Sequence, residues 1–468
     1  MKQITSKTAI AIALLAAVAA CSKEAPMFGH SDGDNLYRST RDVENGLTGA
    51  YNALSAYQFL GRNVIALGDF AADLAVADPS TGHFMDVNAY LISEETDELR
   101  DIWAYGYKVI DRCVRTTAAA KAMLPSASHT DSLALQSALY QAYGLRALTN
   151  LYLVNIFALP YADGQPNDGP GIVVVDEQPV QPFQKVSRAT VAKVYDHIDQ
   201  CIERAHAHLG EHKRLGGSAL GPFYITEPGL LGIEARAHLY RANYAEAARC
   251  AAEAIALCGS PVGNEVYAAM WSTTATTAED VFSLAKSEAD NLSANSLNNL
   301  YQSYLGWVGD TVYSLLAPTD IRLALILDDP DWLLVKWAGL PSSQNTSNVH
   351  IIRLSELYLI QAEAEAQLGN LSEAAEALLP VAQRDSAIAS AADLPSTQAE
   401  LLDFIEQERV RELYAEGHRW FDLRRTARPF MFNGAPFNVA QFCYPIPADE
   451  VNSGSGVEQT PNWAAALP

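Results

Sequence analysis

Two segments of this chain look like copies of one another, and they limit what the chain can fold into. Residues 235–255 and 362–382 are both rich in Ala and carry apolar residues at helical spacing. Each has an Asn in its middle, Asn243 or Asn370, followed by Glu three residues later. This spacing is typical of the start of a helix, where the two side chains satisfy exposed backbone amides reciprocally. Each segment therefore predicts a hairpin of two helices.

The small residues near each turn let the paired helices approach closely, as in tetratricopeptide hairpins, although the regular period of such repeats is missing. Residues 187–209 predict another amphipathic helix with Ser187 or Thr190 as N-cap, and residues 138–155 predict a further one. Alternation typical of strands is scarce outside residues 172–175. We expect a mainly α fold of scattered tetratricopeptide-like hairpins packed as a superhelix.

Long stretches rich in Gly, Pro, Asn and Asp separate these helices, and loops of this length are usually functional or disordered. They are residues 59–96, 160–184, 210–228 and 287–347. The last contains aromatic residues that can stack on sugars or peptide side chains, while Asn and Ser supply hydrogen bonds. An equally open alternative is that these rings only anchor the loop on the helices. The candidate ligand contacts are Tyr301, Tyr304, Trp307 and Tyr313, with Phe84, Asp86 and Trp103 as weaker choices.

The N-terminus predicts export and a lipid anchor. Lys2 and Lys7 precede an apolar stretch at residues 9–17, and small residues lead to Cys21. The order Val-Ala-Ala-Cys resembles a bacterial lipobox, in which the Cys is acylated and becomes the new N-terminus. We therefore expect a signal peptide at residues 1–20 and lipidation at Cys21. No other stretch has the uninterrupted apolar length that a membrane span needs.

Charge and motif content exclude several classes of function. The net charge of −23 disfavours nucleic acid as a partner. The other cysteines have no paired spacing typical of zinc sites and are expected to be small buried hydrophobic residues; they are Cys113, Cys201, Cys250, Cys258 and Cys443. Templates for nucleophilic, zinc-dependent and nucleotide-binding catalysis are absent. Residues 163–169 only loosely suggest a structural calcium loop.

Residues 404–425 contain the most specific motif of the chain. Glu408, Glu412 and Glu416 fall four apart and so share one line of a helix, where like charges repel. Guanidinium groups can hold two carboxylates each and thereby fix how helices dock. We predict a structural ion-pair network rather than a catalytic carboxylate pair. Its expected members are Glu408, Arg409, Arg411, Glu412, Glu416, Arg419, Asp422 and Arg353, with Arg424 and Arg425 as further partners.

This motif resembles the signature of the SusD/RagB family of Bacteroidetes outer-membrane lipoproteins. Other landmarks of the family follow in order along nearly the whole mature chain, at residues 50–54, 103–110, 145–161, 353–364 and 445–450. The chain departs from the pattern near Cys113 and Arg115, where the family has Asn, and at its closing segment. Ser22-Lys23-Glu24 also looks like a surface-export signal of such lipoproteins.

The resemblance implies one helical binding domain over residues 21–468, with an N-terminal portion to about residue 210 and a C-terminal portion from about 225. It implies a lipoprotein of the cell outer membrane, facing the exterior, that captures an oligosaccharide and delivers it to a SusC-like TonB-dependent transporter. It implies no catalysis and no cofactor. The alternatives are a peptide-binding member of the family, a protein-contact scaffold, and a surface hydrolase with acids in the Asp69, Asp73 and Asp78 region.

Overall fold

A computed structural model describes residues 36–217, 220–327 and 333–468 of the chain. The described part is mainly helical, which confirms the predicted fold class. Cys21 and the predicted signal peptide lie outside the described residues. None of the described helices is both long and apolar enough to cross a bilayer.

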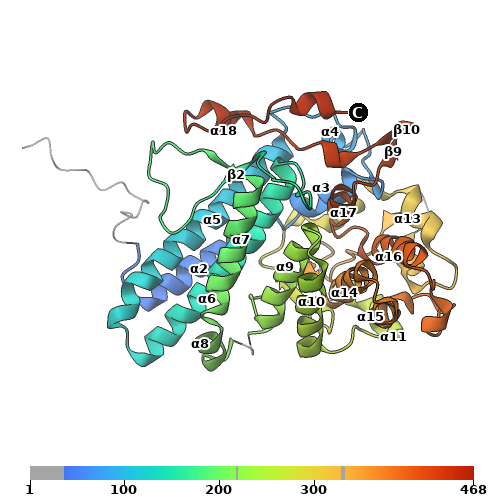
Figure 1. The fold of residues 1–468 in the computed structure, drawn as a ribbon, viewed down its shortest axis with the longest axis horizontal. Coiled ribbons are helices and arrows are strands. Elements are labelled where there is room, and N and C mark those ends of the chain that lie inside the picture. The colour runs from blue at the N-terminus through green and yellow to red at the C-terminus, as the bar shows by residue number, and fades with distance from the viewer. Residues whose placement is uncertain (1–35, 218–219, 328–332) are drawn as a thin grey trace, which may run out of the picture.

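Four long helices form a bundle at one side of the molecule (Figure 1). They are α2 (Thr40–Leu54), α5 (Asp97–Met123), α6 (His129–Phe157) and α7 (Val191–His206). The central helix α6 packs against the other three, and its second half is buried on every side. Both helices predicted here are confirmed, and Thr190 is the N-cap of α7, where its hydroxyl accepts from the Lys193 amide.

The two predicted hairpins are also present, and they pack against one another. They are α9 (Glu227–Tyr240) with α10 (Tyr244–Cys258), and α14 (Leu354–Leu368) with α15 (Leu371–Ala382). The second helix of one hairpin contacts the first helix of the next, α10 against α14, and α16 (Gln398–Leu413) covers α14 and α15. Figure 1 shows this row of helices continuing from the bundle.

The hairpin turns share one backbone geometry but are not capped as predicted. Asn243 has φ −81° and ψ 71°, and Asn370 has φ −85° and ψ 68°. Neither Asn side chain caps the helix that follows it. Each instead reaches five residues back, to Nδ1 of His238 (3.2 Å) or to Oε2 of Glu365 (2.7 Å). The predicted reciprocal capping is therefore wrong, because the amide bonds the end of the preceding helix.

Several segments predicted as long loops contain short helices and strands. The helix α3 lies within residues 59–96, and the sequence pattern missed it because all its residues are buried and show no amphipathic period. A small antiparallel sheet of order β1-β5-β7-β6 joins this region to residues 307–334. The remaining helices are α3 (Asn63–Phe70), α4 (Met85–Asn88), α8 (Leu209–Arg214), α11 (Asn264–Tyr267), α12 (Leu297–Tyr301), α13 (Asp310–Leu315), α17 (Arg419–Thr426) and α18 (Ala448–Asn452). The strands are β1 (Ala75–Val76), β2 (Pro170–Val173), β3 (Arg188–Thr190), β4 (Asp280–Leu284), β5 (Trp307–Val308), β6 (Ile326–Leu327), β7 (Leu333–Leu334), β8 (Val349–Arg353), β9 (Phe430–Phe432) and β10 (Ala435–Phe437).

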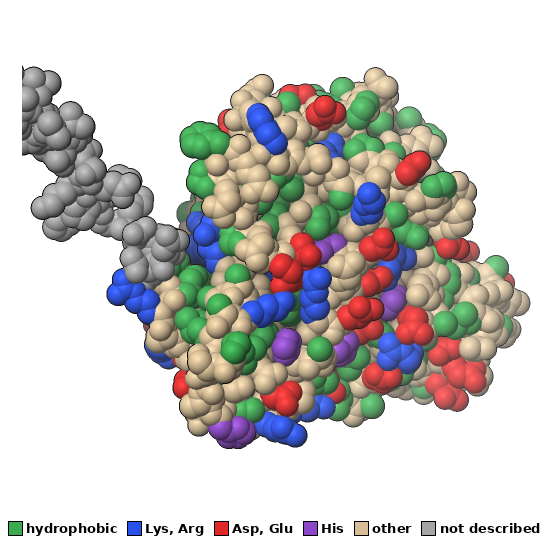
Figure 2. Space-filling model, turned by 60° about the vertical axis from the view of Figure 1, so that its left-hand side comes forward, with side chains coloured by type: hydrophobic (Ala, Val, Ile, Leu, Met, Phe, Trp, Pro, Cys, Tyr) green, Lys and Arg blue, Asp and Glu red, His purple; other side chains and the backbone are tan. Residues whose placement is uncertain are grey.

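The surface mixes charges of both signs. Figure 2 shows acidic and basic side chains interspersed over one face, with histidines among them.

The predicted strand at residues 172–175 is confirmed in part, since β2 ends at Val173 and pairs with β3.

Candidate functional site

The C-terminal motif forms α16, the turn after it and α17. Glu408, Glu412 and Glu416 are all buried there. Only Glu408 and Glu412 share a line of α16, because the helix ends at Leu413 and Glu416 follows in the turn, so the predicted line of three is wrong at Glu416. Three carboxylates this close cannot stay ionised without nearby cations. The structure places cationic side chains from other parts of the chain against all three.

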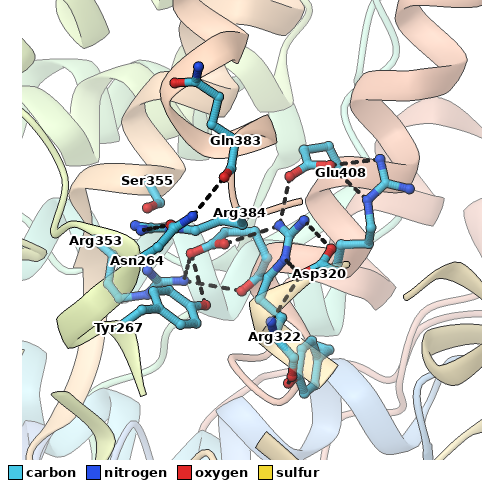
Figure 3. A network of polar contacts seen from close by, with 12 residues as sticks. Asn264, Tyr267, Asp320, Arg322, Arg353, Ser355, Gln383, Arg384 and Glu408 are labelled. Carbon is cyan, nitrogen blue, oxygen red and sulfur yellow. Dashed lines mark hydrogen bonds and ion pairs between the residues drawn. The ribbon is translucent and has the colours of Figure 1, made fainter. Parts of the chain in front are cut away.

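Two arginines, Arg322 and Arg353, bridge these carboxylates, and Figure 3 labels both together with Glu408 and Asp320. Nη1 of Arg322 contacts Glu408 (2.6 Å) and Glu412 (3.2 Å), and the same guanidinium binds Asp320 (2.7 Å). Arg353 contacts Glu412 (2.9 Å), Glu416 (2.6 Å) and Glu279 (2.9 Å). Each guanidinium thus joins α16 or its following turn to a distant segment.

Further cations close the network. Lys336 is fully buried, and its Nζ lies 2.6 Å from Glu416 and donates to the carbonyls of Glu412 and Tyr414 (2.8 Å each). Arg384 contacts Glu279 at 3.0 Å. Burial alone would raise the pKa of the Glu416 carboxyl, but Arg353 and Lys336 outweigh it and hold this pKa well below its usual range. The buried carboxylate therefore stays ionised.

A second part of the network joins α16 to α17 and α14. Arg409 donates to Asp422 (2.8 Å), and Arg425 binds both Asp422 (2.8 Å) and Glu363. Arg411 lies 2.7 Å from Glu408 on its own helix. Burial would raise the pKa of Asp422, but Arg409 and Arg425 lower it far below its usual range. The predicted members other than Arg424 are thus in ion pairs, including Arg419, which contacts Asp73 (2.7 Å) and Glu406 (2.5 Å). Arg424 instead donates to the backbone carbonyls of Ala158 (2.6 Å) and Phe442 (2.9 Å), so its predicted role as an ion-pair partner is wrong.

Sequence reasoning missed about half of this network. Arg322 and Lys336 belong to a stretch predicted as a loop, where charged side chains are normally solvated, yet both are fully buried. The available signal was indirect: three carboxylates on one helical line need more cations than the motif can direct toward them. The other missed partners are Asp320, Glu279, Glu363, Arg384 and Glu406.

The candidate ligand surface lies where residues 71–96 meet residues 291–309. Phe84, Phe70 and Tyr301 form a buried row of rings, with centroid distances of 5.5 Å and 5.4 Å. Phe84 and Tyr301 are each only 1% exposed, so a ligand on the surface cannot reach them. These two predicted contacts are therefore wrong as contacts, because both rings pack beneath the surface.

Tyr304 and His83, which are close in sequence to Tyr301 and Phe84, form a half-buried stack. Their ring centroids are 3.8 Å apart with an interplanar angle of 27°. Burial, and then the nearby guanidinium of Arg62, lower the pKa of His83 below its ordinary value, so the imidazole is neutral at pH 7. Arg62 also lies over the Phe84 ring (5.7 Å) and donates to Asn295 (3.1 Å). His83 and Arg62 escaped the sequence prediction because neither stands in an aromatic-rich segment.

The other predicted contacts lie at different depths. Trp307 is half-buried in β5, where its backbone pairs with Val76 and Leu333. Tyr313 is half-buried in α13 and Asp86 is exposed in α4. Trp103 is buried in α5, donates Nε1–H to Glu450 (3.2 Å) and packs on Tyr107 and Phe157, not on the Tyr304 stack. It lines a separate apolar cleft of about 220 Å³.

The three acids proposed for the hydrolase alternative each have a different partner within the protein. Asp69 is fully buried and accepts from the Gly417 amide (2.9 Å), and burial raises its pKa to about 8. Asp73 is paired with Arg419, and Asp78 bonds the Ser80 amide of its own loop (2.6 Å). Each of the three carboxyls is thus engaged by a different group of the protein.

The contact between Asp69 and Gly417 joins the aromatic loop to the network. The backbones of α3 and the turn after α16 are in direct contact here. A Cβ on Gly68 would therefore lie only 2.2 Å from the Gly417 carbonyl oxygen. Gly417 has φ +79°, and a Cβ there would lie 2.7 Å from Cα of Ile65. Both positions therefore require glycine.

The predicted calcium loop uses its polar groups internally. Asn167 accepts from the Ala162 amide and donates to carbonyls of Ala162 and Gln165, at 2.8–2.9 Å.

None of the five described cysteines is in a disulfide, and four of them are buried as predicted. The fifth, Cys258, is half-buried.

The C-terminal part of the chain matches a known family. Residues 333–440 match the model of the SusD family. The chain is 38% identical to the SusD-like protein P38 of Formosa agariphila over 92 residues, which are 18% of this chain and 18% of that relative. The chain therefore spans less than a fifth of this curated relative.

Solved structures match over nearly the whole chain. A SusD superfamily protein from Bacteroides vulgatus is 24% identical, with a TM-score of 0.79 over 91% of this chain and 100% of that one. A laminarin binding SusD-like protein is 20% identical, with a TM-score of 0.69 over 91% and 100%. At these identities the likeness establishes the fold: the chain has the SusD-superfamily fold.

Proposed function

The chain matches the SusD family at residues 333–440 and has the SusD-superfamily fold, and we propose that it is a nutrient-binding lipoprotein of the outer membrane. It captures an oligosaccharide and delivers it to a SusC-like TonB-dependent transporter. The protein recognises its ligand and does not transform it. In this proposal, acylated Cys21 anchors the chain to the membrane, facing the cell exterior.

The half-exposed stack of Tyr304 and His83 is the observation that carries the oligosaccharide proposal. The lowered pKa of His83 favours the neutral imidazole in this stack, and His83 and Tyr304 are close in sequence to Phe84 and Tyr301 of the buried row. A flat apolar face of this kind suits the apolar face of a sugar ring. The exposed hydroxyl of Ser303 and the half-buried amide of Asn295 offer hydrogen bonds nearby. Trp307 and Tyr313 are proposed as further contacts, with Asp86 at the rim.

The sequence of the N-terminus supports the membrane part of the proposal. A lipobox-like Cys21 follows an export signal, and acyl chains provide stable anchoring. The laminarin binding structural relative supports a glycan as the ligand class.

The test uses the chain from residue 22 onward, which retains every described residue. It is incubated with laminarin oligosaccharides, malto-oligosaccharides and a peptide mixture, and both retention and any change of ligand mass are recorded by mass spectrometry. Retention of an oligosaccharide without a mass change is the expected result. Retention of peptides alone would mean that the ligand is a peptide and not an oligosaccharide. A shortened ligand would overturn the proposal that the protein only binds.

A further inference from the structure

A cluster of metal-binding side chains lies away from the ligand surface and the ion-pair network. One ligand atom each of Glu234, His238 and Cys250 lies within 4.8 Å of the others. Glu234 and His238 stand four apart on α9 and so share one face, and Cys250 points at them from α10. We propose that these three side chains bind Zn²⁺ and that the ion fastens the two helices of this hairpin together.

The chemistry of the donors favours zinc. A thiolate, an imidazole and a carboxylate are the three ligand types that Zn²⁺ takes in tetrahedral sites, with a water or fourth side chain completing the shell. Donors around such an ion are about 3.3–3.8 Å apart, given its bond lengths. Glu234 and His238 already lie 3.8 Å apart, so the side chains need only small movements.

Burial and charge also suit a divalent cation. Cys250 is buried, while the Glu234 and His238 side chains are 13% and 14% exposed, which leaves the ion a way in. The Cys250 thiol gives up its proton to solvent when its sulfur binds the ion. The thiolate and the Glu234 carboxylate then neutralise the two positive charges.

A histidine from a third helix supports the carboxylate from behind. Nε2 of His206, at the end of α7, lies 2.9 Å from Oε2 of Glu234. Hydrogen bonds of this kind orient a ligating carboxylate. The ion would thus connect the N-terminal bundle to the first hairpin through Glu234.

Two neighbouring side chains must adjust when the ion binds. Nη2 of Arg249 now lies 3.1 Å from Cys250 Sγ and 3.4 Å from Glu234, where it supplies the positive charge. It can withdraw to Glu246 and Glu253, which it already contacts at 2.8 and 2.9 Å. The Asn243 amide must reverse, so that its oxygen accepts from Nδ1–H of His238 while Nε2 binds the ion. Arg241, 3.1 Å from the same Nδ1, keeps its two bonds to Asp199.

Spacing along the chain does not reveal this site. Two donors stand on α9 and the third comes from α10, with no paired-Cys or His-rich motif. Only the fold of the hairpin brings them together.

The test titrates the metal-free chain from residue 22 onward with Zn²⁺ and, in parallel, with Co²⁺. We expect one ion per chain and a thiolate-to-cobalt charge-transfer band. A Zn²⁺ concentration 100-fold above Kd should also raise the melting temperature by roughly 3 °C. Absence of the band or of one-to-one binding in the parent chain overturns the proposal.

Matched variants locate the site. Cys250→Ser and Glu234→Gln should each weaken Zn²⁺ binding by about 100-fold or more, and Cys250→Ser should abolish the band. Cys258→Ser, which removes a thiol about two turns further along the same helix, should change neither. Equal binding by Cys250→Ser and Cys258→Ser overturns the assignment. Glu234→Gln keeps the test decisive where Cys250→Ser fails to fold in circular dichroism. Arg249→Gln should tighten binding, and weaker binding would contradict the displacement of this guanidinium.

Discussion

The ion-pair network around α16 and the surface around Tyr304 are built on opposite principles. In the network, Glu408, Glu412 and Glu416 are buried and each is paired with cations. At the surface, Tyr304 and His83 are half-buried and stack ring on ring. The region with the most distinctive sequence is therefore the one whose carboxylates are paired inside the molecule. Its motif identifies the scaffold, while the proposed ligand surface lies on loops that carry no comparable motif.

The largest expected effect comes from removing a central cation of the network. Arg353→Ala leaves Glu412, Glu416 and Glu279 buried with less compensation, and we expect a loss of about 3–5 kcal/mol of unfolding free energy. Urea unfolding followed by circular dichroism measures it. A loss below about 1 kcal/mol would mean that the network does not hold the helices.

The next effect concerns Asp69, which connects the two regions. Its folded pKa of about 8 lies above the ordinary value of 3.8, so it is protonated in the fold at pH 5. The protonated Asp69 therefore contributes to the free energy of unfolding in full below about pH 4. This contribution decreases as the pH rises from about 4 and is lost above about pH 8. Asp69→Asn should remove this dependence and stabilise the protein at pH 8.5 by an amount on the order of a few kcal/mol.

Melting temperatures of Asp69→Asn and the parent chain at pH 5 and pH 8.5 provide the measurement. The two curves should lie close together at pH 5 and separate at pH 8.5. Equal slopes against pH would show that Asp69 is ionised in the fold.

At the surface, the expected change is in binding alone. Tyr304→Ala removes the outer ring of the stack and should weaken oligosaccharide affinity by about 10- to 100-fold. Calorimetry with the ligand retained in the panel measures it, and the melting temperature should stay unchanged because the ring is half-exposed. Tyr304→Phe is the control, since it keeps the ring and should keep most of the affinity. Unchanged affinity in Tyr304→Ala would remove this site from the proposal.

The smallest effect is expected at the rim of the network. Arg428 pairs with Asp403 (2.6 Å) and Glu406 (2.9 Å), but its side chain is 41% exposed. Arg428→Ala should lose less than about 1 kcal/mol in the same urea experiment. An equal loss of unfolding free energy in Arg428→Ala and Arg353→Ala would mean that burial does not determine how much each arginine contributes to stability.

Local sequence pattern predicted the helical elements well. The Ala-rich segments form hairpins as predicted, and Thr190 is the N-cap of α7. Both features could be predicted because apolar spacing and N-cap chemistry act over a few residues. The helix α3 was missed since complete burial removes its amphipathic period. Pattern also predicted the carboxylate line of α16 but not Arg322, whose burial depends on contacts across 86 residues to Glu408.

The candidate site was harder to predict for the same reason. Tyr301 and Tyr304 are three residues apart in one aromatic segment, yet one is buried on Phe70 and the other stacks on His83 near the surface. Composition ranks these two residues alike. Their difference arises from the packing of residues 71–96 against residues 291–309, which local sequence does not encode.

The contact between Gly68 and Gly417 has a consequence for protein engineering. Because backbone touches backbone at this point, the aromatic loops are fixed to the scaffold at a joint where the side chain of Asp69, which accepts from the Gly417 amide, must be kept together with the glycines. Exposed or half-buried loop residues beyond it, such as those at 79–83 and 302–305, can be exchanged without redesigning the helices beneath, whereas Phe84 packs on Phe70 of α3 and must be kept. Binding specificity in this molecule should therefore be transplantable by grafting short segments, provided both glycines are kept.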